Sequence, residues 1–417
     1  MTTLATPVAP TERVAEMDII RGFALLGIFI MNMPAFAMSP FAGADGSHLF
    51  PLLHDRIAEE ARDVLFSGKF NSMFSFLFAV GFTIQLARLQ AADPASARGI
   101  YLRRILILLA LGLTHAFVFW FGDVLHIYAV LGLLLLLGLP RLSDRTLVAL
   151  MVACLVIPTL GSIVLKFTLT PDYFRHQIAA MQAFEAADNL AFGHGSFADA
   201  RRETTRITMF FYTDPMALWS YLKFYLEMST TLLLGLLAGR HLWIQRAAQH
   251  LGWIRRAQWV ALAVGLLAGL VVLAANLNYD PTRITALGIA GGLCYRICRL
   301  GLMIFYVTSI VRAAQLPAWR RRFAPVALAG RMPLTNYLLQ TAMATFIFDA
   351  WGLGWWNRVG PLGQLLLAIA LYGLIQLPLS SWWFARFRYG PLEYLWRAAT
   401  YGRLPPMRAA LPDTVAA

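Results

Sequence analysis

The sequence predicts an all-α polytopic integral membrane protein built as a single membrane domain, residues 1–417. Of these residues, 59% are hydrophobic and 14% are charged, and the mean hydropathy is +0.61. Soluble domains carry about 45–50% apolar and about 25% charged residues. The apolar residues also gather into ten stretches of about 17–25 residues, the length that an α-helix needs to cross a bilayer.

The ten expected spans follow one another along the whole chain. We place them at residues 19–38, 70–89, 104–121, 124–139, 146–166, 220–241, 257–275, 284–312, 325–349 and 361–385. Only Gly122 and Asp123 separate the third span from the fourth, so the run 105–139 is expected to be a tight hairpin. A single helix of that length would measure about 52 Å, far more than the roughly 30 Å hydrocarbon core.

The arginine and lysine residues orient these spans. With the N-terminus inside, 22 of the 35 basic residues fall at cytoplasmic ends and 11 at outer ends, and the last two lie within the eighth span. Cytoplasmic loops of membrane proteins are enriched in Lys and Arg. We therefore expect both termini in the cytoplasm.

Residues 167–219 form the largest segment between spans. Residues 177–190 and 199–212 have the pattern of amphipathic helices, and the glycines of 193–196 separate them. On the predicted orientation this insertion is extracytoplasmic. We expect its helices to lie on the outer membrane surface or to cap an outward cavity.

Two arginines stand where the eighth span would cross the middle of the bilayer. Arg296 and Arg299 interrupt the otherwise apolar run 284–312. An arginine at that depth costs about 2.5–3.5 kcal/mol even on insertion scales. Residues three apart share a helix face, so both should face a protein interior or a wet cavity and meet something negative there. Glu227, in the sixth span, is the candidate counter-charge, and an anionic substrate is the other.

Polar residues also gather in the third and fourth spans. His115 and Asp123 are eight residues apart on nearly the same helix face, and His126 opens the fourth span. A histidine with a carboxylate in reach suits general-base catalysis, because the carboxylate fixes the imidazole tautomer. The alternative is a histidine that hydrogen-bonds neighbouring helices as a structural contact. We take His115 and Asp123 as candidate catalytic residues and His126 as a candidate substrate contact.

Three amide side chains are further candidates for substrate contact. Asn32 lies in the first span, and Asn336 and Gln340 lie four residues apart on one face of the ninth. Amides at this depth bridge helices or line a path for a polar molecule. The sequence leaves both possibilities open.

Several classes of site are excluded. The sequence has no phosphate-binding glycine loop and no GxSxG, HExxH or CxxC motif, so ATPase, hydrolase and metalloprotease functions have no support. Cys294 and Cys298 have no histidine or carboxylate beside them, so no metal site is expected. The net charge of +13 comes from loop arginines that follow the positive-inside rule, and we expect no nucleic-acid partner.

Several blocks of sequence resemble the YeiB-type family of bacterial membrane proteins, a family named for a domain of unknown function. They span nearly the whole chain in the order typical of the family. The blocks are DIIRGFALLGI (18–28) with Asn32, KFNSMFSFLF (69–78), residues 103–125 and 128–129, GRMPLTNY (330–337) and GPLEYLWR (390–397). The resemblance implies a multi-pass protein of the bacterial inner (cytoplasmic) membrane.

The YeiB-type proteins are in turn distantly similar to transmembrane acyltransferases, including the lysosomal enzyme that acetylates heparan glucosamine. This similarity implies acyl transfer from cytosolic acyl-CoA, with acetyl-CoA as one donor and no permanently bound cofactor. His115 would be the base, and Arg103, Arg104 and Arg331 would hold the phosphates of the donor. The acceptor would be a small molecule or a glycan that carries a hydroxyl or an amine.

Two other functions stay open from the sequence. A transporter or exporter of an anionic or amphipathic small molecule would use the buried arginines for its substrate, and His115 with Asp123 as a proton relay. A non-catalytic membrane scaffold would need none of these residues for chemistry. The lipid bilayer is a partner in every case, and a homodimer is a further partner that we consider.

Overall fold

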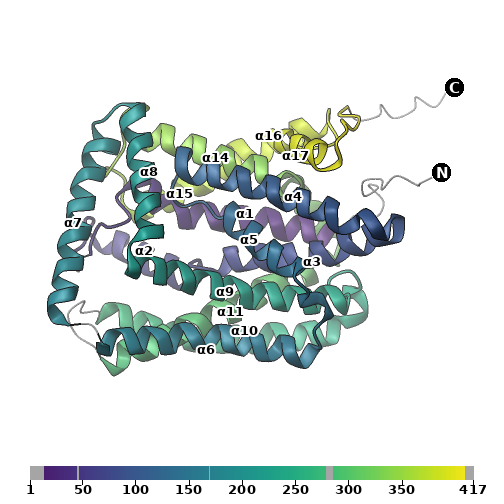
Figure 1. Ribbon diagram of the computed structural model, residues 1–417, viewed down its shortest axis with the longest axis horizontal. Coiled ribbons are helices and arrows are strands. Elements are labelled where there is room, and N and C mark those ends of the chain that lie inside the picture. Colours follow the sequence, from purple (N-terminus) through teal and green to yellow (C-terminus); the bar gives the residue numbers. More distant parts are fainter. Residues whose placement is uncertain (1–13, 45–46, 169, 279–284, 409–417) are drawn as a thin grey trace.

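The computed structural model describes residues 14–44, 47–168, 170–278 and 285–408, and every named element within them is a helix. Most helices run along the long axis of the molecule and pack as one bundle (Figure 1). Two helices, α7 (Pro171–Gly193) and α8 (Phe197–Thr213), stand across one end of this bundle. We call these two helices the cap.

Seven helical segments of the described residues are long and apolar enough to cross a membrane. They are α1 (Ala15–Ala37), α2 with α3 (Leu53–Leu65 and Lys69–Ala92), α4 with the π-helical turn η2 (Pro94–Thr114 and His115–Phe119), α6 (Asp144–Thr168), η4 with α10 (Ala247–His250 and Leu251–Leu277), α11 (Ala286–Ala314), and α15, η5 and α16 (Pro361–Leu371, Tyr372–Gln376 and Leu377–Phe384). The chain is therefore a polytopic membrane protein.

The remaining helices are shorter or more polar. They are α5 (Leu125–Leu136), η3 (Leu139–Arg141), α9 (Pro215–Arg240), α12 (Pro317–Arg322), α13 (Ala324–Arg331), α14 (Pro333–Phe348) and α17 (Pro391–Tyr401). Each of the ten spans expected from the sequence falls on helical structure, with residue 284 outside the described residues. The count of ten, the sides of the membrane and the cytoplasmic termini stay predictions.

The expected ninth span, 325–349, is not one helix. It is divided at Met332 into α13 and α14. Pro333 is the first residue of α14, a position that suits proline because the N–H of that residue has no partner within the helix. The break turns the backbone N–H groups of α14 toward α17, where the Glu393 carboxylate accepts from Leu334 N (2.7 Å) and Thr335 N (3.0 Å).

The expected hairpin of residues 105–139 is confirmed, because α4 packs on α5 along it. The turn between them is not a plain loop. The last turn before it, His115–Phe119, is π-helical, and its ladder bond runs from Trp120 N to His115 O (2.9 Å). π-Helical turns are rare and occur often at functional sites.

Two helices, α7 and α8, are present where two were expected in 167–219, and the chain breaks between them at 194–196. The outer side of the membrane stays a prediction for this segment. Asp188 of α7 is fully buried and accepts from Ser39 Oγ (2.5 Å) after α1. Phe192 O accepts from Ala350 N (2.7 Å). These contacts fix the cap to the bundle at that end.

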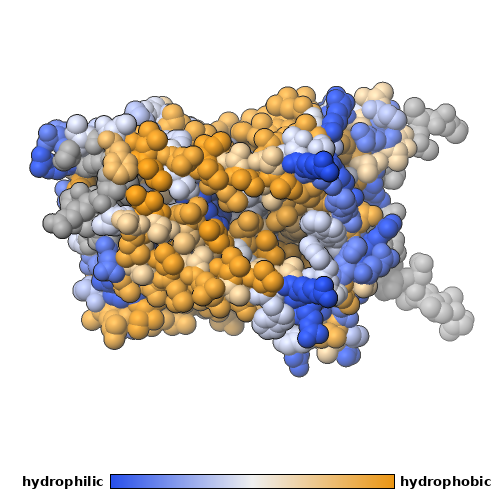
Figure 2. All heavy atoms as spheres, turned by 90° about the horizontal axis from the view of Figure 1, so that it is seen from below, coloured by the Kyte–Doolittle hydropathy of each residue, from blue (hydrophilic) through white to orange (hydrophobic). Residues whose placement is uncertain are grey.

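Apolar side chains cover the middle of the molecular surface, and hydrophilic ones gather toward its two ends, on the face that Figure 2 shows. Exposed leucines and valines of α6 and α10 contribute to this apolar surface, among them Leu160, Val164, Val260 and Leu267. Exposed apolar side chains on a chain this hydrophobic are expected to contact lipid.

Helix α1 lies at the centre of the bundle, where it packs against α3, α13, α14 and α15. Its approach to α13 is so close that two glycines are required. A Cβ on Gly330 would lie 1.9 Å from Asp18 O, and one on Gly22 would lie 2.1 Å from Val326 O. Both glycines belong to the blocks singled out in the sequence, and both serve helix packing.

We predict that Gly330→Ala lowers the free energy of unfolding by roughly 1–3 kcal/mol, because the added methyl overpacks a backbone contact. Gly99→Ala is the matched control, since a Cβ there meets nothing within 4 Å and alanine is the better helix former. The measurement is the thermal unfolding midpoint of the two purified variants in detergent. Equal midpoints for both variants would refute the close α1–α13 contact.

Candidate functional site

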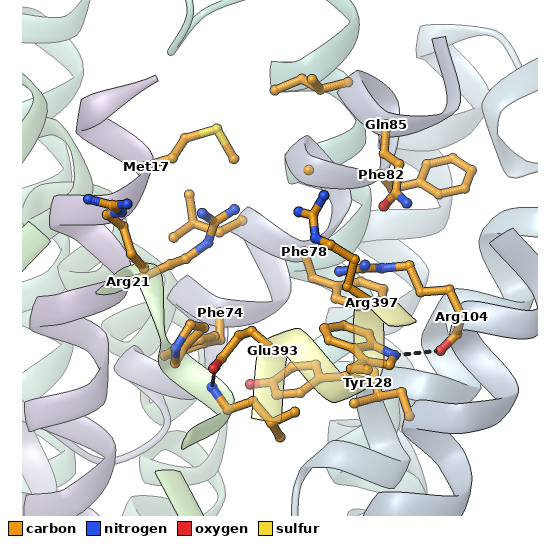
Figure 3. Close-up of a pocket in the computed structure, with 18 of the residues that line it drawn as sticks. Met17, Arg21, Phe74, Phe78, Phe82, Gln85, Arg104, Tyr128, Glu393 and Arg397 are labelled. Atoms are coloured by element: carbon orange, nitrogen blue, oxygen red, sulfur yellow. Dashed lines mark hydrogen bonds between the residues drawn. The ribbon is translucent and has the colours of Figure 1, made fainter. Parts of the chain in front are cut away.

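A cavity of about 750 Å³ opens at one end of the bundle, and Val14 before α1 and Tyr401 at the end of α17 both line it. Its volume lies within the range of small-molecule sites. Five arginines from five different helices line it: Arg21 of α1, Arg88 of α3, Arg104 of α4, Arg331 of α13 and Arg397 of α17. Figure 3 shows Arg21 on one side of this space and Arg104 and Arg397 on the other.

Aromatic rings support several of these guanidinium groups. Arg104 lies 3.7 Å above the ring of Trp396, and Arg397 lies 4.6 Å from the centre of the Tyr389 ring. Arg331 lies 4.0 Å above Phe384. Stacking on aromatic faces favours the planar guanidinium and fixes its direction.

The two carboxylates that line the cavity are already engaged. Asp18 accepts from Arg21 at 2.8 Å, and Glu393 accepts from the N-terminus of α14. Five guanidinium groups against two carboxylates leave a positive field in the cavity. Such a field favours a ligand with several negative charges, of which phosphate groups bond arginine best.

The inner part of the cavity is apolar. Leu25 and Ile28 of α1, Phe74 of α3 and Leu108 of α4 line it, and Val124, Tyr128 and Tyr337 also contribute to its wall. The cavity thus combines a cationic part with a hydrophobic part. That combination suits an amphipathic anion.

Directly behind this wall lies a buried unit of two histidines and one carboxylate. His115 Nδ1 donates to Asp123 Oδ1 (2.8 Å), and His126 Nδ1 donates to Asp123 Oδ2 (2.7 Å). All three side chains are at most 3% exposed. An ionised carboxylate accepts hydrogen bonds and cannot donate them. Each imidazole therefore carries its proton on Nδ1 and its lone pair on Nε2. The contact expected between His115 and Asp123 is present, and His126 joins it.

Each Nε2 atom faces a hydroxyl group. Thr341 Oγ1 of α14 donates to His115 Nε2 (3.0 Å), and the Tyr212 phenol of α8 donates to His126 Nε2 (2.7 Å). The unit therefore connects the bundle interior with the cap through one line of hydrogen bonds. We call it the His115–Asp123–His126 unit.

Tyr337 links this unit to the cavity. Its phenol oxygen accepts from Val124 N (3.4 Å), and its ring lies 5.3 Å from the ring of His115. Both Tyr337 and Val124 line the cavity, whereas His115 does not. One layer of side chains thus separates the imidazole from the cavity.

Helix α8 donates hydrogen bonds to the backbone carbonyl groups of the π-helical turn. Thr208 Oγ1 donates to Ala116 O (2.8 Å), Thr205 Oγ1 to Phe117 O (2.7 Å) and Arg201 to Val118 O (3.2 Å). Buried carbonyl groups need such partners. The cap is therefore part of the structure that places His115.

The buried arginines of α11 form a separate ion-pair cluster. Arg296 Nε lies 3.2 Å from Glu227 Oε1, and Arg299 bonds the other oxygen of the same carboxylate. Arg299 Nε also donates to Ser72 Oγ (2.7 Å), and Arg296 Nη1 donates to Gly292 O (2.6 Å). The counter-charge expected in Glu227 is confirmed. None of these three charged residues lines the arginine cavity, so the structure does not bring them together with Arg104 and Arg331.

The amide candidates bridge helices. Asn336 donates to Ala329 O (3.0 Å) and Ser380 Oγ (3.2 Å), and Gln340 donates to Gln376 Oε1 (2.9 Å). Gln376 belongs to the second π-helical turn, η5, and donates to Asn336 O (2.8 Å). Asn32 is half-buried on α1 and is not part of the cavity wall.

Of the three arginines expected to bind the donor, Arg104 and Arg331 line the cavity and Arg103 is exposed outside it. The candidate residues did not include Arg21, Arg88, Arg397 or Tyr212. The three arginines were counted among the basic residues at the cytoplasmic ends of the expected spans, and Tyr212 lies 86 residues from the histidine that it bonds. Arg21 and Arg397 lie in the family blocks 18–28 and 390–397, whereas Arg88 and Tyr212 lie in none of the blocks.

Residues 238–403 match the family model described as "Protein of unknown function (DUF418)". The chain is 29% identical to "Uncharacterized protein YxaH" of Bacillus subtilis (strain 168) over 408 residues, which cover 95% of this chain and 96% of that protein. It is 28% identical to "Uncharacterized protein YeiB" of Escherichia coli (strain K12) over 434 residues, which cover 96% and 98%. These matches support the resemblance to the YeiB-type family that the sequence blocks indicate. The printed descriptions name no function, so the matches bear on that resemblance alone.

We predict that Glu227→Gln destabilises the protein by about 3–5 kcal/mol, because it leaves two guanidinium groups buried without their carboxylate. Glu59→Gln is the control, since this residue is one-third exposed and makes long contacts, 3.6 Å to His48 and 3.8 Å to Arg62. The measurement is the yield of folded protein and its unfolding midpoint in detergent. A Glu227→Gln protein as stable as the control would contradict the ion-pair cluster.

Proposed function

We propose that this protein is an integral-membrane acyltransferase of the bacterial inner membrane. It takes an acyl group from cytosolic acyl-CoA and delivers it to a hydroxyl or amine in or across the membrane. One observation carries the proposal. The arginine-rich cavity at one end of the bundle extends inward to a wall, and a single layer of side chains in this wall separates the cavity from the His115–Asp123–His126 unit.

The two parts of the cavity fit the two parts of such a donor. The five arginines would hold its phosphates, with Arg104 and Arg331 in the roles expected from the sequence. The aromatic rings of Trp396, Tyr389 and Tyr401 also line the cavity, and the adenine ring of the donor would pack against them. The apolar inner part would receive the pantetheine arm with its thioester end directed toward Tyr337.

The His115–Asp123–His126 unit would supply the base. The proton of the acceptor O–H or N–H group passes to an imidazole of the unit, and the acceptor lone pair forms the new bond to the thioester carbonyl carbon. The C–S bond breaks, and CoA leaves as a thiolate that regains the proton from the imidazolium. Asp123 stabilises the imidazolium because it bonds both rings.

Transport of an anionic or amphipathic small molecule is the second candidate, because the same cavity accepts an anion without any thioester chemistry. The line of hydrogen bonds from Thr341 to Tyr212 would then serve as a proton relay. Counterflow of CoA-free anions in proteoliposomes distinguishes this function from acyl transfer. A scaffold without chemistry would show neither.

We predict that Arg104→Gln weakens the binding of acetyl-CoA about 10- to 100-fold, since a hydrogen bond to a charged group contributes about 1.5–3 kcal/mol. Arg103→Gln is the matched control, because this neighbour on α4 lies outside the cavity. Titration calorimetry in detergent measures both affinities. Equal affinities, or no binding by the wild type, would overturn the proposal.

We predict that His115→Gln and Asp123→Asn lower acyl transfer by at least about 100-fold, the usual contribution of a general base. The affinity for acetyl-CoA should stay within twofold of the wild type, because neither side chain lines the cavity. Transfer of labelled acetyl groups to envelope extract gives the rate. A full rate in both variants would exclude the unit from the chemistry.

A further inference from the structure

Two tyrosines belong to the apolar inner part of the arginine cavity. Tyr128 of α5 and Tyr337 of α14 both line it, and they are 6% and 5% exposed. Their neighbours in this wall, among them Leu25, Ile28 and Leu108, carry no polar side-chain atom. The two phenol groups therefore offer polar contacts in apolar surroundings, at the end of the cavity where the thioester of the proposed donor would lie.

The two phenols differ in where their protons go. Tyr128 donates to Asn71 O at 2.9 Å, so its proton is already bonded within the protein. Tyr337 accepts from Val124 N at 3.4 Å, and no group within residues 14–44, 47–168, 170–278 and 285–408 accepts the proton of its phenol. A buried hydroxyl that donates to nothing loses the free energy of a hydrogen bond, and most such groups have a partner. The proton of Tyr337 is thus available to a ligand.

The backbone that contacts the Tyr337 phenol belongs to the turn that Asp123 orders. Val124 follows Asp123, whose carboxylate accepts from His126 N at 3.0 Å. An N–H group that donates to a phenol oxygen polarises the O–H bond and makes it a stronger donor. The Tyr337 ring also lies 5.3 Å from the ring of His115. The phenol that can donate and the proposed base therefore belong to neighbouring side chains.

We infer that Tyr337 is a catalytic residue, whose phenol donates a hydrogen bond to the carbonyl oxygen of the thioester. This inference rests on the proposed function, since it concerns the donor in that cavity. When the acceptor attacks the carbonyl carbon, the π electrons of the C=O bond move to the oxygen, which becomes an oxyanion. Tyr337 stabilises this charge and keeps its own proton. When the C=O bond forms again, the C–S bond breaks and CoA leaves as the thiolate.

The amide side chains of α14 do not compete for this role. Asn336 Nδ2 donates to Ala329 O and Ser380 Oγ, and Gln340 Nε2 donates to Gln376 Oε1. Neither amide lines the cavity. A tyrosine phenol is one of the side chains that form oxyanion holes, in which the donor atom lies about 2.7–3.1 Å from the charged oxygen.

The first test is the rate of acetyl transfer to envelope extract by the full chain in nanodiscs, at saturating acetyl-CoA. In Tyr337→Phe this rate should fall about 100- to 1,000-fold, the usual loss when one oxyanion donor is removed. The Kd of acetyl-CoA should change less than about tenfold, since a neutral hydrogen bond in the ground state contributes little. Tyr225→Phe on α9 is the matched control, because Tyr225 lies outside the cavity wall, and it should keep the wild-type rate.

Tyr337→Phe also removes the acceptor of Val124 N, so a second readout follows the hydrogen bond itself. Infrared difference spectra of carbonyl-labelled acetyl-CoA, bound without an acceptor, report the C=O stretch of the thioester. A hydrogen bond from Tyr337 should lower this frequency in the wild type relative to Tyr337→Phe. Replacement of Tyr337 by a fluorotyrosine keeps the contact with Val124 and makes the phenol more acidic, so it should lower the frequency further.

Binding of acetyl-CoA on the same samples separates this inference from the proposed function. Wild-type protein that does not bind acetyl-CoA would refute the donor site and the role of Tyr337 together. Normal binding with the same C=O frequency in the wild type and Tyr337→Phe would refute the role of Tyr337 and leave the acyltransferase intact. An undiminished transfer rate in Tyr337→Phe would also overturn that role.

Discussion

The carboxylate of Asp123 is the point on which this architecture depends. It accepts from two imidazoles and from His126 N (3.0 Å), so one buried charge orders the turn between α4 and α5. A buried carboxylate is tolerated only where donors surround it. The π-helical turn brings His115 into that position, and α8 donates hydrogen bonds to the carbonyl groups of the turn. Thr341 of α14 and Tyr212 of α8 bond the Nε2 atoms of the two histidines. The hairpin, the cap and the bundle core are therefore all connected through Asp123.

Two groups of arginines in this protein illustrate two different uses of the same side chain. Arg296 and Arg299 share the Glu227 carboxylate and bond the surrounding backbone and Ser72, which is how charge is kept within a membrane protein for structural reasons. Three of the five cavity arginines, Arg104, Arg331 and Arg397, instead stack on aromatic rings, and the five outnumber the two carboxylates beside them. The cavity therefore carries a net positive charge, which favours an anionic ligand.

The sequence predicts the helical membrane fold, the hairpin, the two cap helices and the pairing of Glu227 with the arginines, because all of these follow from local hydropathy, spacing and charge. It also predicts the contact of His115 with Asp123, which are close along the chain. It cannot predict the cavity, whose arginines come from five helices far apart in sequence, or the Tyr212 bond. Arg103 and Arg104 are equivalent in sequence, and only the rotation of α4 places one inside and the other outside. The single ninth helix expected from hydropathy fails because Pro333 starts a new helix.

The most direct test of this account is an experimental structure of the protein with a non-hydrolysable acyl-CoA analogue. We predict density for the phosphates among Arg104, Arg331 and Arg397, with the acyl end beside Tyr337 and Val124. Density for the analogue beside Arg296 and Arg299, or a cavity that stays closed to it at saturating concentration, would contradict the account.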